Sequence, residues 1–125
     1  SAAHIARAAL ESVAFQTADL VAAMAEDGAG ALSSLRVDGG MAANDWFCQF
    51  LADLLDIPVE RPVNLETTAL GAAMLAGHRC GGWPDVLDGS AADEGLTRFE
   101  PAMAPEQRLR LTSEWQAAIR RATMT

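Results

Sequence analysis

The sequence has few basic residues, few cysteines and no long apolar run, and each of these shortages excludes a class of protein. Nine basic residues against 17 acidic ones give a formal net charge of −8, and the longest basic run is Arg120-Arg121. A nucleic-acid-binding protein has the opposite charge pattern. Because no apolar stretch approaches the ~20 residues that span a bilayer, we expect no membrane span and a cytoplasmic protein. Cys48 and Cys80 lack the spacing of a metal site or a disulfide framework, so we predict two reduced thiols.

The usual glycine motifs for phosphate binding are missing as well. Asp38-Gly39-Gly40-Met41-Ala42-Ala43 does not supply the GxGxxG spacing of a Rossmann fingerprint, and no Gly-Lys-Ser/Thr follows it as a Walker A motif requires. His4 and His78 have no partners at the spacing of a metal site or a catalytic triad. Glu66 stands just before a predicted helix, where its negative charge interacts favourably with the helix dipole. We therefore assign it no proton transfer.

The 125 residues, half of them apolar, suffice for one modest globular core, so we expect one domain or one piece of a domain. Apolar periodicity and turn residues predict a series of helices and strands. In chain order these are a helix over residues 4–26 ending at Asp27-Gly28, a buried strand around residues 35–37, a helix over residues 44–55, a strand over residues 59–61 ending at Pro62, a helix over residues 69–76 ending at Gly77, and a final helix after Pro105. A threonine hydroxyl of Glu66-Thr67-Thr68 is expected to cap the helix over residues 69–76, and its small side chains indicate close approach to a neighbouring element.

Residues 78–104 show no clear periodicity and contain several glycines, prolines and acidic residues. This composition predicts an irregular surface connection with one short turn around Trp83. Trp46, Trp83 and Trp115 are scattered along the chain and are predicted to be packing residues. Two strands make too small a sheet to be stable alone. Either further strands are hidden in residues 78–104, or the chain is part of a larger domain, and the second explanation accounts for more of the pattern.

Two glycines connect the first predicted strand to the helix that follows it. Such a pair lets the chain turn with positive φ and lets a flat ligand approach the backbone, because no Cβ stands in the way. A tight structural turn explains Gly39 and Gly40 equally well. Asn44 either caps the helix or hydrogen-bonds a ribose or a purine, and its spacing alone favours the cap. For Asp38, a structural role in the turn is favoured over the positioning of a metal-bound water.

Three ordered segments closely resemble the C-terminal part of the FGGY carbohydrate kinases. These segments are His4-Ile5-Ala6-Arg7-Ala8-Ala9-Leu10-Glu11 followed by Ala14-Phe15-Gln16, then Arg36-Val37-Asp38-Gly39-Gly40-Met41-Ala42-Ala43-Asn44, then Glu66-Thr67-Thr68-Ala69-Leu70-Gly71-Ala72-Ala73. The family belongs to the actin, hexokinase and Hsp70 superfamily. The resemblance implies an α/β fold, a partial ribonuclease H-like domain with the order α-β-α-β-α plus a C-terminal helix. Glu66-Thr67-Thr68 ahead of Ala69-Leu70-Gly71 favours the glycerol kinases of this family over xylulose or gluconate kinases.

The resemblance further implies a two-domain enzyme that transfers the γ-phosphoryl group of Mg-ATP to a hydroxyl of glycerol. Family likeness puts Gly40 and Asn44 beside the adenosine of ATP, with Gly39 as the supporting turn. In the family, the catalytic carboxylate, the polyol site, the phosphate loop and most ligands of Mg²⁺ lie in other parts of the enzyme. We therefore predict no catalytic residue and no metal ligand in this chain. We also expect the protein to form a homo-oligomer.

By the same resemblance, residues 1–125 are expected to be the C-terminal portion of the ATP-binding C-terminal domain. The first strands of that domain and the whole N-terminal domain are then absent from this chain, and the chain alone is expected to be inactive. An alternative from another class is a stand-alone, non-catalytic interaction or structural module. Such a module would self-associate to complete its sheet, since unpaired strand edges and uncovered apolar faces favour association.

Overall fold

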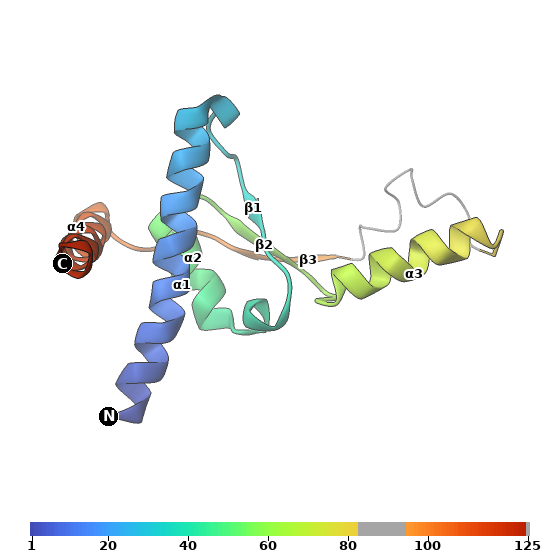
Figure 1. Cartoon of the computed structure of the whole chain (residues 1–125), viewed down its shortest axis with the longest axis horizontal. Helices are drawn as coiled ribbons and strands as arrows, with labels where there is room; N and C mark the ends of the chain where they lie inside the picture. The colour runs from blue at the N-terminus through green and yellow to red at the C-terminus, as the bar shows by residue number, and fades with distance from the viewer. Residues whose placement is uncertain (83–94, 125) are drawn as a thin grey trace.

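The computed structural model describes residues 1–82 and 95–124, which form four helices and three strands in alternation (Figure 1). In chain order they are α1 (Ala2–Met24), β1 (Leu35–Arg36), α2 (Asp45–Leu55), β2 (Val59–Pro62), α3 (Thr67–Arg79), β3 (Leu96–Phe99) and α4 (Pro105–Thr123). A wider helical turn, Ala25–Ala29, follows α1 and includes the predicted stop at residues 27 and 28. The α/β class and the six predicted elements are confirmed, and one strand is added to them.

The three strands form one mixed sheet in the order β1-β2-β3. β1 and β2 are parallel, with Leu35 opposite Val59, because α2 carries the chain back across the sheet between them. β2 and β3 are antiparallel, with Val59 opposite Phe99. The prediction of an irregular connection over residues 78–104 is therefore wrong at residues 96–99. Only the ends of β3 are half-buried, so the segment has no period of two that the sequence could reveal. The turn predicted around Trp83 lies outside the described residues.

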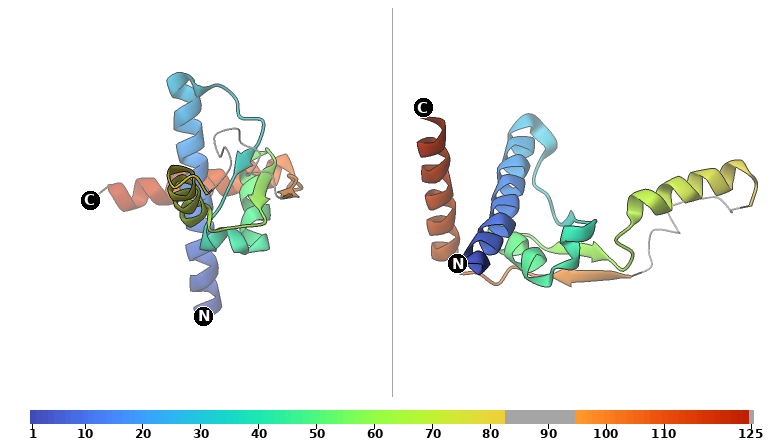
Figure 2. Two further views of the ribbon diagram at one scale, coloured as in Figure 1. Left: turned by 90° about the vertical axis from the view of Figure 1, so that its right-hand side faces the viewer. Right: turned by 60° about the horizontal axis from the view of Figure 1, so that its bottom comes forward.

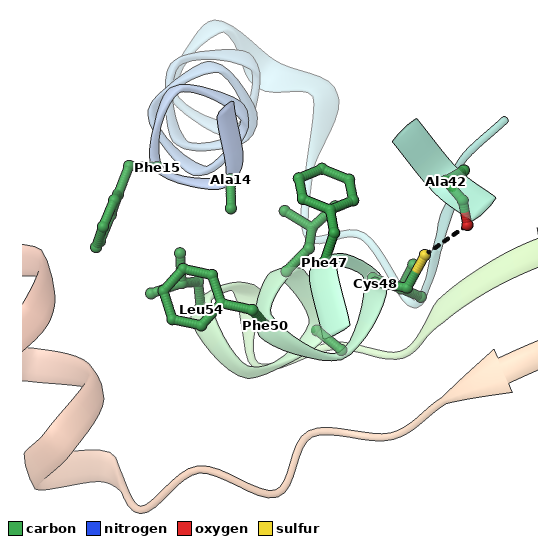
Figure 3. Close-up of a cluster of buried hydrophobic side chains, with 10 residues drawn as sticks. Ala14, Phe15, Ala42, Phe47, Cys48, Phe50 and Leu54 are labelled. Atoms are coloured by element: carbon green, nitrogen blue, oxygen red, sulfur yellow. Dashed lines mark hydrogen bonds between the residues drawn. The ribbon is translucent and has the colours of Figure 1, made fainter. Parts of the chain in front are cut away.

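The core lies where α2 packs between α1 and the sheet (Figure 3). The apolar face predicted for the second helix is confirmed, since Phe47, Phe50, Leu51 and Leu54 are all buried. The remaining buried apolar residues come from α1, the turn before α2, α2 itself and β2: Ala14, Phe15, Ala42, Cys48, Ala52 and Val59. The prediction of a buried first strand is wrong. β1 has two residues and lies at the edge of the three described strands, with Leu35 half-buried and Arg36 exposed.

Four aromatic side chains form a continuous row from α2 across α1 to α4. Trp46 stacks on Phe50 at 5.0 Å between ring centroids, and Phe50 meets Phe15 edge to face at 5.8 Å. Phe15 in turn stacks on Trp115 of α4 at 5.1 Å. The packing role predicted for Trp46 and Trp115 is confirmed. The indole N–H of Trp115 also donates to Asp19 Oδ2 at 2.7 Å, which ties α4 to α1.

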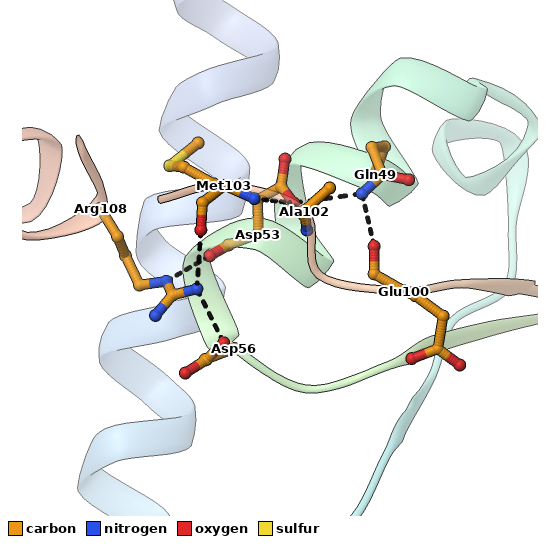
Figure 4. A network of polar contacts seen from close by, with 7 residues as sticks. All are labelled: Gln49, Asp53, Asp56, Glu100, Ala102, Met103 and Arg108. Atoms are coloured by element: carbon orange, nitrogen blue, oxygen red, sulfur yellow. Dashed lines mark hydrogen bonds and ion pairs between the residues drawn. The ribbon is translucent and has the colours of Figure 1, made fainter. Parts of the chain in front are cut away.

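Polar contacts join the end of α2 to the segment that leads into α4 (Figure 4). Asp53 Oδ1 accepts hydrogen bonds from the backbone N–H groups of Ala102 and Met103 at 2.7 and 3.1 Å. Arg108 donates to the carbonyl oxygen of Asp53 at 2.6 Å and to Asp56 Oδ1 at 2.7 Å. A cation at the C-terminus of a helix is favoured by the helix dipole. α4 is thus held to α2 through polar contacts as well as through the aromatic row.

α3 extends away from the rest of the chain (Figures 1 and 2). None of its residues is buried, and Leu75 is 63% exposed. The predicted close approach of its small residues to a neighbouring element is therefore not found within residues 1–82 and 95–124. The predicted stop at Gly77 is also wrong. α3 ends two residues later, and Gly81, with φ of 71°, accommodates the left-handed turn that follows a helix. None of the described helices is long and apolar enough to cross a membrane.

Candidate functional site

The connection between β1 and α2 is a tight turn that only glycine fits at its first bend. Gly39 has φ of 82° and ψ of 176°, a backbone conformation that strains a residue with a Cβ. Its N–H donates to the carbonyl oxygen of Leu65 at 3.1 Å, and its own carbonyl accepts from the N–H of Ala42 at 3.1 Å. Residues Gly40–Ala43 then form a single 3-10 turn that leads into α2. Two features predicted from the sequence are confirmed here, the positive φ and the glycine turn ahead of a helix.

Gly40 has no such backbone reason to be glycine. Its φ is not in the left-handed range, and among the described residues none beyond the adjoining chain lies within 4 Å of the position that a Cβ would occupy. The residue is exposed. Its missing side chain therefore leaves an open stretch of backbone at the surface, where a flat ligand can approach closely.

Asn44 is the N-cap of α2, as its spacing predicts. Its side-chain Oδ1 accepts from the N–H of Phe47 at 3.1 Å, and the residue is exposed. The cap engages only the oxygen of the amide. Within the described part of the chain, no hydrogen bond is found for the Nδ2 group, which keeps two donors for a ligand. The cap and a ligand contact are thus compatible in the same side chain.

Asp38 ties the turn to the start of α3. Its Oδ2 accepts a hydrogen bond from the hydroxyl of Thr67, next to the contact between Gly39 and Leu65. The structural role favoured from the sequence is confirmed, but its partner is a threonine and not the N–H groups of the turn. The threonine cap predicted for α3 is wrong for the same reason. Glu66 occupies the N-cap position without a side-chain hydrogen bond, and the Thr67 hydroxyl is used by Asp38.

Arg61 of β2 holds the other end of the turn, and no motif in the sequence marks this residue. One of its terminal nitrogens (Nη1) donates to the carbonyl oxygen of Ala42 at 2.8 Å and to Asp45 Oδ1 at 2.7 Å. The guanidinium lies over the ring of Phe99, 5.2 Å from its centroid. The side chain is only 17% exposed. The available sequence signal was a charged residue within a predicted strand, where a charge needs a partner when it is covered.

A shallow hollow lies next to the turn and is lined partly by Arg61. Its volume is about 310 Å³, and it opens between the turn, β2, the chain after β2 and β3. The residues that line it are Ala43, Arg61, Pro62, Val63, Leu65 and Thr97. The turn therefore exposes its backbone at Gly40 and borders the hollow at Ala43.

Cys48 is buried beneath the turn, where its thiol donates to the carbonyl oxygen of Ala42 at 3.3 Å (Figure 3). Burial raises the pKa of the Cys48 thiol, and the nearby charge of Arg61 offsets part of that rise. Both cysteines are free, as the sequence predicts, and Cys80 is exposed.

We expect alkylation to distinguish these two thiols. The thiolate is the reactive form, and a raised pKa together with burial keeps Cys48 protonated and shielded near neutral pH. Iodoacetamide should therefore modify Cys80 at least about tenfold faster than Cys48, as followed by mass spectrometry of the peptides. Both should react at similar rates in denaturant. Equal rates in the native protein would show that Cys48 is accessible and that the turn does not cover it.

Potential metal ligands do not gather in the part of the chain that the structure describes. No group of three or more histidine, cysteine, aspartate or glutamate side chains lies together there.

A mixed sheet packed against helices, with a glycine turn that leads into a capped helix, defines an α/β protein with a candidate ligand site at the turn. The model of the FGGY family of carbohydrate kinases, C-terminal domain, matches residues 1–80. The chain belongs to this family.

Among curated proteins, the chain is similar to glycerol kinases over nearly its whole length. It is 56% identical over 119 residues to the glycerol kinase of Gluconobacter oxydans, a match that covers 95% of this chain and 23% of the relative. The glycerol kinase of Rhodospirillum centenum is also 56% identical, with 95% of this chain and 24% of the relative covered. The chain thus spans about a quarter of the length of these relatives.

A solved structure shows the same fold. The crystal structure of Plasmodium falciparum glycerol kinase with ADP matches 98% of this chain and 24% of that chain, with a TM-score of 0.76 and 38% sequence identity. The family and the fold class indicated by the sequence segments are both confirmed.

Proposed function

We propose that this chain forms the adenosine-binding side of an ATP-dependent kinase that phosphorylates glycerol. The observation that carries the proposal is the 56% identity to glycerol kinases across 95% of the chain. A structural relative at 38% identity was solved with ADP, which supports a nucleotide as ligand. The full reaction converts ATP and glycerol to ADP and glycerol 3-phosphate.

The turn provides two elements of adenosine binding. The exposed backbone at Gly40 lets a flat group lie against the chain without meeting a side chain. The Nδ2 group of Asn44 donates a hydrogen bond to the adenosine, while its Oδ1 continues to cap α2. By fixing one end of the nucleotide, these residues align the γ-phosphate at the other end for in-line attack, and such positioning is a main part of phosphoryl-transfer catalysis. Mg²⁺ neutralises the developing charge in this chemistry, and we propose that its ligands belong to other parts of the enzyme.

We further propose that the chain is the C-terminal portion of the ATP-binding domain. It spans about a quarter of its relatives. In residues 1–82 and 95–124 the sheet has three short strands and α3 buries none of its residues, as expected if other parts of the domain cover them. The alternative of a self-associating module receives no support from the comparisons. Homo-oligomerisation stays a prediction.

A coupled ADP-release assay tests the proposed function. In the complete protein that carries this chain, glycerol should give a higher kcat/KM than xylulose or gluconate. The 125-residue chain alone should give no turnover. A preference for a sugar would overturn the substrate, absence of ATP-dependent turnover with any of these substrates would overturn the kinase, and turnover by the chain alone would overturn its assignment as a part of a domain.

A further inference from the structure

Within the described chain, the glycine turn is anchored at both ends by residues from elsewhere in the sequence. At its start, Asp38 and Gly39 are tied to the segment that opens α3. At its end, Arg61 links the carbonyl oxygen of Ala42 to the carboxylate of Asp45, the first residue of α2. Gly40 follows the first of these contacts in the chain, and Asn44 lies between Ala42 and Asp45, the two residues that Arg61 contacts. Their relative placement therefore depends on both anchors.

We propose that Arg61 is a positioning residue for nucleotide binding, which fixes the turn so that Gly40 and Asn44 face the adenosine together. This inference rests on the proposed function. The side chain of Arg61 is only 17% exposed, and its Nη1 donates to the carbonyl oxygen of Ala42 and to Asp45, so we assign it an action through the turn. Its guanidinium suits the task because a planar group with several fixed donors can serve two acceptors while it stacks on the Phe99 ring.

Positioning explains the geometry better than stability does. The carboxylate of Asp45 is 77% exposed, and solvent screening at that end limits what the ion pair adds to stability. The carbonyl of Ala42 also keeps a second donor, the Cys48 thiol at 3.3 Å, so loss of Arg61 does not leave it without a partner. What Arg61 alone provides is the link between the end of the turn and the first residue of α2.

A matched control is available on the neighbouring strand. Arg36 of β1 pairs with Glu60 at 3.4 Å, and its side chain is 60% exposed. Glu60 precedes Arg61 in β2, so the two side chains point to opposite faces of the sheet. Arg36→Gln thus removes an arginine and an ion pair from the same sheet without changing the contacts of the turn.

The test compares Arg61→Gln, Arg61→Lys and Arg36→Gln in the complete protein that carries this chain. Arg61→Gln should raise the KM for ATP and the Kd for ADP about tenfold, with kcat and the KM for glycerol within about twofold of wild type. Arg61→Lys should restore part of the loss, since an ammonium group can still reach one acceptor. Arg36→Gln should leave all of these constants unchanged. Asp45→Asn, which changes an exposed partner and leaves the core intact, should raise the KM for ATP about twofold.

The outcomes separate this inference from the function on which it rests. If the wild-type protein phosphorylates glycerol with ATP and Arg61→Gln retains the wild-type KM for ATP, the positioning role is wrong and the proposed function stands. Equal increases in both KM values, or a loss of thermal stability without rescue by lysine, would assign Arg61 a structural role only. If Arg61→Gln does not fold, an unchanged KM for ATP in both Arg61→Lys and Asp45→Asn overturns the inference. A wild-type protein that binds neither ADP nor ATP overturns the proposed function, and this inference with it.

Discussion

Replacing Gly40 by valine is expected to raise the KM for ATP at least about tenfold in the complete protein that carries this chain, with little change in the KM for glycerol. The reason is steric. Gly40 is not in a backbone conformation that requires glycine, and no described residue beyond the adjoining chain lies within 4 Å of the added Cβ. Valine should therefore fit the fold and keep the thermal stability. What it removes is the open backbone surface against which the adenosine is proposed to lie.

Gly39→Val serves as a contrast to this substitution. Gly39 has φ of 82°, so a side chain there strains the backbone, at a cost of about 1–3 kcal/mol. We expect this variant to lose thermal stability as well as nucleotide affinity. The pair thus separates the effect of covering the surface from the effect of distorting the turn.

Two substitutions of Asn44 separate the loss of the amide donor from the loss of the helix cap. Asn44→Asp keeps an oxygen for the cap of α2 and places a negative charge at the helix N-terminus, which the dipole favours. It removes the amide donor proposed to contact the adenosine, so the KM for ATP should rise while the thermal stability is retained. Asn44→Ala removes the cap as well, which typically costs about 1 kcal/mol. If neither Gly40→Val nor Asn44→Asp changes the KM for ATP, the adenosine assignment is wrong.

Local patterns in the sequence were sufficient to predict α2 and its cap. Its apolar residues recur at helical spacing, and the cap involves residues only three apart, Asn44 and Phe47. The glycine turn follows from the same kind of local evidence, because glycine tolerates the positive φ that such a turn needs. These features needed no knowledge of distant parts of the chain.

Contacts between distant segments were not predictable in this way. β3 is a strand because it pairs with β2, and its burial pattern does not alternate. Arg61 reaches the turn across 19 positions of sequence, and Thr67 reaches Asp38 across 29. For α3, the sequence predicted a contact that the described chain does not contain. Its small residues suggested a close neighbour, yet none is found in the described chain, because composition indicates what a helix can pack against and not whether the partner is present.

The row of aromatic side chains predicts the largest effect on stability. Phe15 is 8% exposed and contacts both Phe50 of α2 and Trp115 of α4. Truncation of a buried phenylalanine to alanine typically costs about 3–5 kcal/mol, and each aromatic pair lost adds about 0.5–1.5 kcal/mol beyond its buried area. Phe15→Ala should therefore lower the melting temperature of the complete protein by several degrees.

The same variant should release α4 more than the sheet. Phe15 is the aromatic link between Trp115 and the rest of the row, so amide hydrogen exchange in α4 should accelerate more than exchange in β2. Ile5→Ala on the same helix is the control, because Ile5 is 74% exposed and its truncation removes little buried surface. Equal melting temperatures for the two variants would show that the aromatic row does not hold α1, α2 and α4 together. Uniform acceleration of exchange in α4 and β2 would show instead that α4 is fixed mainly by Arg108 and Asp53, whose contacts Phe15→Ala leaves in place.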